Sequence, residues 1–152
     1  MKRTRRLLLA ASCLVVLGCL VSPARVRAED IVIIVHRDVR VESLTRAMVS
    51  EIYLGTRTKW ADESTIKVVM LKKGPVHEMF VKELVGTTPA KLRNVWKKVV
   101  FTGTGTPPRI FKHEDDLVEF IAENGGTIGY ISPSTPHEGV KVIPLDDGKS
   151  VK

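Results

Sequence analysis

Residues 31–35 read Ile31-Val32-Ile33-Ile34-Val35, an unbroken run of β-branched aliphatic residues. A strand that does not alternate polar with apolar residues is expected to be buried on both faces. Such strands are typical of α/β sheets that helices cover on both sides. This run therefore favours an α/β fold, and the segments that follow it decide how the sheet is covered.

Segments with helical periodicity separate this strand from the later ones. Thr45 is positioned to cap a helix, and Gly55 to end it; two further helices begin with a proline in their first turn. Helices are expected at about 46–54, 75–85, 89–100 and 114–123. Strands are expected at 31–35, 66–71, 127–131 and 140–145, and loops at 36–42 and 101–109. This order predicts an α/β fold, a central β-sheet flanked by about four helices.

Residues 1–28 have the pattern of a secretory signal peptide. A basic start precedes an apolar run from Leu7 to Val21, and Val26-Arg27-Ala28 has the residues that signal peptidase accepts. The run is shorter than the roughly 20 residues that span a bilayer. Cleavage is expected after Ala28, with Ala24 as the second choice, giving a periplasmic or secreted protein. A lipoprotein anchored through Cys19 is the less favoured alternative.

The charge and the cysteines belong mainly to this leader. The net charge is +7, but six of the 24 basic residues lie in residues 1–28, which contain no acid. The nearly balanced remainder argues against a nucleic-acid partner. Both cysteines, Cys13 and Cys19, lie in the leader, so residues 29–152 cannot form a disulfide or a thiolate metal site. A single α/β domain over 29–152, with no transmembrane segment, is expected.

No pattern points to catalysis. A Gly-x-Ser-x-Gly motif is absent, and the TGTGT segment at 102–106 lacks the Gly-Lys-Ser/Thr ending of a phosphate loop. The acidic run after His113 fits the first turn of a helix better than a metal site. The prediction is a protein that is not an enzyme and that needs no cofactor and no metal.

Three ordered stretches carry a resemblance to a known family. They are Ile52-Tyr53-Leu54-Gly55 followed by Trp60, Trp96 followed by Val100-Phe101-Thr102-Gly103, and Gly126-Thr127-Ile128-Gly129-Tyr130-Ile131. They resemble segments of the phosphate-binding proteins of ABC transporters and of their small single-domain relatives. The resemblance implies a single lobe of a type II periplasmic-binding-protein-like fold. Tyr53 and Trp60 are interpreted as packing residues, and Gly55 and Gly129 as positions that need a permissive backbone.

The resemblance also suggests where a ligand would bind. In that family this lobe holds the anion at a Ser-Gly-Thr-type turn that opens the helix after the second strand. Here the segment reads Met70-Leu71-Lys72-Lys73-Gly74-Pro75-Val76-His77, which lacks the hydroxyl groups, and Pro75 has no N–H. The candidate oxyanion ligands that remain are Lys72, Lys73, Gly74, Val76 and His77, at a helix N-terminus. A solvated basic loop without a ligand is the alternative.

The sequence is compatible with two functions. The first is an exported, non-catalytic solute-binding protein that holds phosphate or another oxyanion weakly, as the resemblance to phosphate ABC transport implies. The second is an envelope interaction or structural module that has kept the fold and lost ligand binding. In that case an exposed sheet edge would dock an envelope protein, or a second copy in a homodimer.

Overall fold

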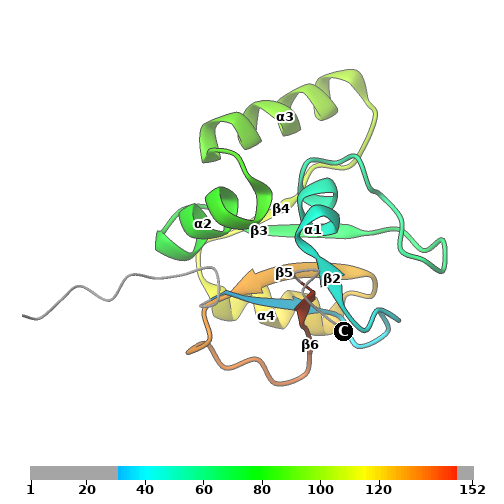
Figure 1. Cartoon of the computed structure of the whole chain (residues 1–152), viewed down its shortest axis with the longest axis vertical. Coiled ribbons are helices and arrows are strands. Elements are labelled where there is room, and N and C mark those ends of the chain that lie inside the picture. The colour runs from blue at the N-terminus through cyan, green and yellow to red at the C-terminus, as the bar shows by residue number, and fades with distance from the viewer. Residues whose placement is uncertain (1–30, 147–152) are drawn as a thin grey trace, which may run out of the picture.

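The computed structural model describes residues 31–146, and a five-stranded sheet lies at its centre (Figure 1). The predicted signal peptide and Cys19 lie outside the described residues. Within the described range the strands are β1 Val32–Val35, β2 Leu44–Thr45, β3 Lys67–Leu71, β4 Arg109–Phe111, β5 Thr127–Ile131, β6 Lys141–Ile143 and β7 Leu145–Asp146. The sheet order is β4-β3-β5-β1-β6, and β2 pairs separately with β7. Strands β3, β4 and β5 run parallel, whereas β1 is antiparallel to both β5 and β6.

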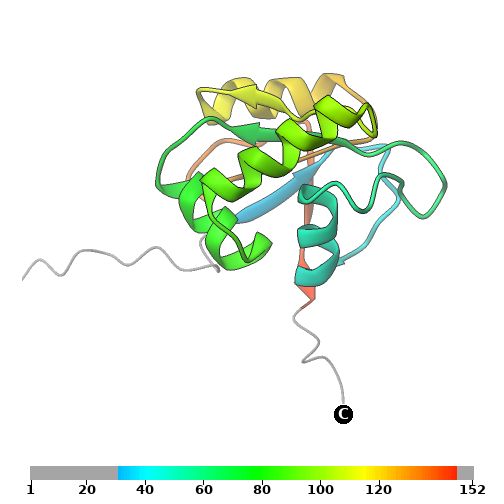
Figure 2. The same ribbon diagram turned by 90° about the horizontal axis from the view of Figure 1, so that it is seen from above.

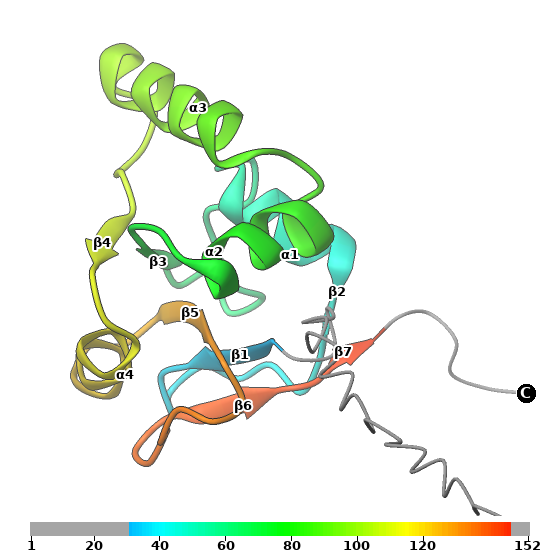
Figure 3. The same cartoon turned by 90° about the vertical axis from the view of Figure 1, so that its left-hand side faces the viewer.

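Helices cover both faces of this sheet. They are α1 Arg46–Tyr53, α2 Pro75–Met79 with its π-helical continuation η2 Phe80–Val85, α3 Pro89–Thr102 and α4 Glu114–Glu123. Helix α4 packs on one face, and α1, α2 and α3 lie on the other (Figure 3). None of the helices in residues 31–146 is long and apolar enough to cross a membrane.

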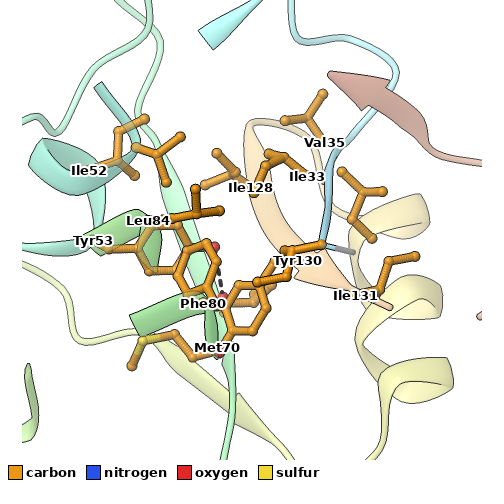
Figure 4. Packing of buried hydrophobic residues seen from close by; sticks show 14 of the residues in the cluster. Ile33, Val35, Ile52, Tyr53, Met70, Phe80, Leu84, Ile128, Tyr130 and Ile131 are labelled. Carbon is orange, nitrogen blue, oxygen red and sulfur yellow. Dashed lines mark hydrogen bonds between the residues drawn. The ribbon is translucent and has the colours of Figure 1, made fainter. Parts of the chain in front are cut away.

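An aromatic cluster fills the core between the sheet and helices α1 and α2 (Figure 4). The rings of Phe80 and Tyr130 stack with centroids 3.7 Å apart, and Tyr53 meets Phe80 edge-on at 4.6 Å. The Tyr53 hydroxyl donates to the Val69 carbonyl at 3.2 Å. Trp60 is buried elsewhere in the core and donates its indole N–H to the Gly126 carbonyl at 3.0 Å. The predicted packing roles of Tyr53 and Trp60 are confirmed.

Local signals place most elements correctly. The Thr45 hydroxyl caps α1 by accepting the Met48 N–H at 3.2 Å, and Gly55 has φ +76° after the helix end. The predicted limits of α4 and β5 are confirmed. Residues 33–35 are buried, as their aliphatic run predicts.

The largest differences from the predicted boundaries occur at three places. Residues 101 and 102 still belong to α3, because the left-handed residue that ends this helix is Gly103. Arg109 is not in a loop: it begins β4, a strand of three residues that is too short to leave a periodic pattern. The strand expected at 140–145 is interrupted at Pro144, which separates β6 from β7.

The interpretation of Gly129 as a permissive backbone position is also wrong. Its φ does not lie in the left-handed region, and the position needs glycine because of space. A Cβ atom at Gly129 would lie 2.6 Å from Ile121 Cδ1 and 2.8 Å from Leu117 Cδ2. The absence of a side chain therefore lets α4 lie close against β5.

Candidate functional site

The turn between β3 and α2 holds the residues that the sequence singled out. The Lys72 N–H donates to the Phe111 carbonyl at 2.8 Å, which ties the turn to β4. Gly74 follows with φ +117°, a conformation that favours glycine, and its carbonyl accepts the Glu78 N–H at 2.9 Å. Pro75 occupies the first turn of α2, as predicted. The turn thus has a defined shape although most of its side chains face solvent.

A pocket of about 330 Å³ lies beside this turn. Lys73, Gly74 and Val76 line it, together with residues that come from other parts of the chain. Lys72 is exposed and does not line the pocket, and neither does His77, which is buried. The structure therefore brings three of the five candidate residues to one cavity.

The side chain of His77 points into the core. Its Nδ1 atom lies 2.5 Å from the Tyr130 hydroxyl, which also accepts the Leu71 N–H at 3.2 Å. Burial lowers the pKa of His77, a lowering to which Arg93 adds and which Glu78 opposes. Burial likewise raises the pKa of Tyr130. At neutral pH the histidine ring and the tyrosine hydroxyl are both uncharged, so their hydrogen bond joins two neutral groups.

The other wall of the pocket consists of residues that the sequence did not indicate as part of this site. It is formed by the β4–α4 turn and by the loop after β5, through Lys112, His113, Glu114, Asp115 and Thr135. Because β3, β4 and β5 are parallel, their carboxyl ends meet at one edge of the sheet, where open α/β sheets usually bind ligands. A prediction of strand β4 would have indicated this wall, because the pairing of β4 with β3 places Lys112 near the turn at Lys73.

Glu114 holds the loop after β5 through its carboxylate. The same oxygen, Oε2, accepts the Ser132 N–H and the Thr135 hydroxyl, each at 2.6 Å. The Ser132 hydroxyl in turn lies 2.9 Å from that of Thr135 and 3.0 Å from that of Ser134. A carboxylate of the chain itself thus occupies a set of donors that would otherwise suit an external oxyanion.

Chemically, the pocket combines two lysines with two acids. Lys73 and Lys112 provide positive charge, whereas Glu114 and Asp115 reduce it. No group of three or more His, Asp or Glu side chains within residues 31–146 is placed to hold a metal ion. The opposite charges partly cancel, so the positive potential in the pocket is lower than two lysines alone would give.

No protein-family model matches the chain, and no curated protein sequence does. Solved structures do match it. A protein described as a phosphate ABC transporter substrate-binding protein, from Clostridium perfringens and with bound phosphate, superposes with a TM-score of 0.61 at 23% identity. That match covers 76% of this chain and 44% of the other. An ABC-type phosphate transport receptor from Vibrio cholerae gives 0.58 at 19% identity, over 80% of this chain and 47% of that one.

A third match is PstS from Borrelia burgdorferi, with a TM-score of 0.60 at 11% identity, over 77% of this chain and 47% of the other. At identities this low, the superpositions show the fold alone: the chain has the α/β architecture found in part of these substrate-binding proteins. It spans less than half their length, 44% to 47%, which agrees with the predicted single lobe. The resemblance drawn from the three sequence stretches is confirmed at the level of the fold.

Proposed function

We propose that the protein is an exported, non-catalytic binding module that holds inorganic phosphate or a similar oxyanion weakly. One observation carries this proposal: Lys73 and Lys112 line one pocket with the Gly74 turn, at the carboxyl ends of three parallel strands. The shared fold supports it, since one protein with this fold was solved with bound phosphate. Export and a link to an ABC transporter are part of the same proposal.

Each candidate residue receives a role in this proposal. Lys73 and Lys112 supply charge from opposite walls, and Lys72 adds charge from the exposed side of the turn. Gly74 leaves open space, since a Cβ there would meet nothing within 4 Å. Val76 lines the pocket and contributes a first-turn N–H group. The N–H of His77, the next in the turn, has no acceptor within the helix either, although His77 does not line the pocket. The buried side chain of His77 takes no part.

Two features keep the expected affinity low, in the millimolar range. The pocket lies open at one edge of the sheet, so a bound phosphate keeps much of its contact with water. Glu114 and Asp115 also line the pocket and repel an anion. No catalytic step is proposed.

Titration by NMR tests the proposal directly. We expect the amide signals of residues 72–78 to move with added phosphate, and the double variant K73A/K112A to weaken that response at least about fivefold. The matched control is K97A/K98A, which removes the same charge from α3. Unmoved amides at 50 mM phosphate, or equal responses in both variants, would refute the site. Sulfate and molybdate titrations then rank the oxyanions.

A specific observation favours a second function, an interaction module without a ligand. The Glu114 carboxylate already occupies the donors of Ser132 and Thr135. Both edge strands also expose a large apolar residue, Ile110 at 48% on β4 and Val142 at 44% on β6. Size-exclusion chromatography with light scattering distinguishes the two: a stable homodimer that ignores phosphate would support the second function and exclude the first.

A further inference from the structure

Helix α3 carries positive charges that form no ion pair within the described residues. The chain has no Asp or Glu between residues 84 and 113, a stretch that includes all of α3. The basic residues of the helix are all exposed, and none has an ion pair within residues 31–146: Lys91, Arg93, Lys97 and Lys98. By contrast, several other cations do contact a carboxylate, namely Arg57, Lys59, Lys82 and Lys141.

The end of the same helix exposes apolar side chains. Phe101 is 92% exposed and Val100 is 54% exposed. The segment that follows, 102–108, contains only Thr, Gly and Pro and therefore carries no charged side chain. A single exposed apolar residue on a soluble protein needs no explanation. Here, however, an almost fully exposed phenylalanine follows two lysines and precedes an uncharged loop. The end of the helix therefore combines an exposed apolar side chain with neighbouring positive charges.

The charges of the molecule are also separated in space. Helix α4 has five acidic residues and no basic one. It packs on the opposite face of the sheet from α3 (Figures 1 and 3). Viewed from above, α3 lies nearest to the viewer over the other elements (Figure 2). A molecule with a basic end and an acidic far side is turned by the field of an extended anionic surface, so that its basic end faces that surface.

We propose that α3 and the loop after it dock on the surface of an anionic lipid bilayer. Lys91, Lys97 and Lys98 contact lipid phosphates, while Phe101 enters the boundary between head groups and acyl chains. Basic helices with an aromatic residue bind membranes in this way, through charge and a small buried apolar area together. A lipid surface is favoured over an acidic protein because it offers both an extended negative plane and an apolar layer for the Phe101 tip. The proposal does not depend on oxyanion binding at the pocket.

Vesicle flotation tests it with the chain that starts at Glu29, because residues 1–28 have a basic and apolar sequence of their own. This shortened chain keeps every core residue in the part of the chain that the structure describes. We expect binding to phosphatidylcholine vesicles that contain phosphatidylglycerol, little binding to pure phosphatidylcholine, and a strong loss in 0.5 M salt. The variant K97E/K98E should lower the partition coefficient at least about tenfold, and F101A about fivefold.

The matched control is R37E/R40E, which changes the net charge equally at two exposed positions between β1 and β2. Circular dichroism of each variant confirms that the fold is kept. The proposal is overturned if the unaltered protein ignores anionic vesicles at low salt, or if the control loses as much binding as K97E/K98E. It is also overturned if light scattering shows that α3 mediates self-association and that vesicle binding is unaffected by the α3 variants.

Discussion

At the scale of single residues, Tyr130 joins the core to the candidate site. Its ring stacks on Phe80, and its hydroxyl bonds both the Leu71 N–H and the His77 ring. A buried tyrosine hydroxyl needs a partner, and His77 supplies one. The side chain of a residue predicted as a ligand therefore lies in the core, because its ring is the hydrogen-bond partner of that buried hydroxyl.

The lowered pKa of His77 predicts how stability depends on pH. The unfolded chain takes up a proton near pH 6.5, which the buried ring of the folded chain resists. The free energy of unfolding is therefore not reduced by this group above about pH 6.5, and it falls as the pH drops below that value. Urea unfolding between pH 7.5 and 5 should show this slope in the unaltered protein and a smaller one in H77Q. The exposed-site control H113Q should keep it; an unchanged slope in H77Q would contradict the prediction.

The two tryptophans should respond differently to replacement by phenylalanine. Trp60 donates to the Gly126 carbonyl at 3.0 Å, whereas the buried indole N–H of Trp96 has no partner in the described part of the chain. W60F loses a hydrogen bond, whereas W96F loses none and instead removes an unsatisfied buried donor. We expect W60F to be less stable than W96F by about 1–2 kcal/mol in chemical denaturation. Equal losses would show that Trp96 finds a partner, such as water.

At the scale of elements, the contact between α4 and β5 sets the spacing of one layer. Gly129 leaves room for the side chains of Leu117 and Ile121, both fully buried. The same helix begins at Glu114, whose carboxylate holds the loop after β5. Helix α4 is thus attached to β5 along its length by packing and at its start by hydrogen bonds, which fixes one wall of the pocket.

G129A should destabilise the protein by about 1–3 kcal/mol, because an added methyl group overpacks the α4 contact. The control G105A adds a methyl group in an exposed loop without a positive φ, where its Cβ would lie 3.1 Å from Val99 Cγ1. It should change stability by less than about 1 kcal/mol, because an exposed loop can shift to relieve one such contact. Thermal or urea unfolding measures both. A tolerated G129A would mean that α4 can shift outward without cost.

E114A should cost about 1–3 kcal/mol, because it removes hydrogen bonds from the Ser132 N–H and the Thr135 hydroxyl to a charged group. D116A removes the same charge from the same helical turn and should cost about 0.3–1 kcal/mol, the size of a helix-dipole contribution. Urea unfolding compares the two variants. If they lose stability equally, the two hydrogen bonds contribute nothing beyond charge.

At the scale of the whole molecule, the openness of the pocket limits how tightly the proposed ligand can be held. The pocket opens at one edge of the sheet, and the chain spans under half the length of the substrate-binding proteins with this fold, 44% to 47%. A ligand in an open pocket loses less water and gains less contact than one enclosed between two lobes. The phosphate binding that we propose is therefore expected to be weak and readily reversed.

Phosphate should raise the melting temperature only slightly. With millimolar affinity, 50 mM phosphate stabilises the folded state by about 1–2 kcal/mol, which corresponds to a rise of a few degrees for a domain of this size. Sodium chloride at equal ionic strength should give a smaller rise, and K73A/K112A should lose the difference. A rise that sodium chloride reproduces fully would mean that only ionic strength acts.

The sequence by itself determined the elements whose signals are local: the aliphatic run of β1, the capped start of α1, the acidic first turn of α4 and the strand β5. Burial pattern, capping residues and helix stops lie within a few residues of the element they specify. The three family-like stretches also indicated the fold correctly, because their order follows the order of the elements.

Only the tertiary structure decided which residues share the pocket and which are committed to the core. Lys73, Lys112 and Thr135 line one pocket because β3 pairs with β4 and β5. The ring of His77 forms a hydrogen bond with Tyr130, which lies 53 residues away in the sequence. Such contacts leave no periodic trace, because they depend on strand pairing and packing between distant segments, whose free energy is gained only after the intervening chain has folded.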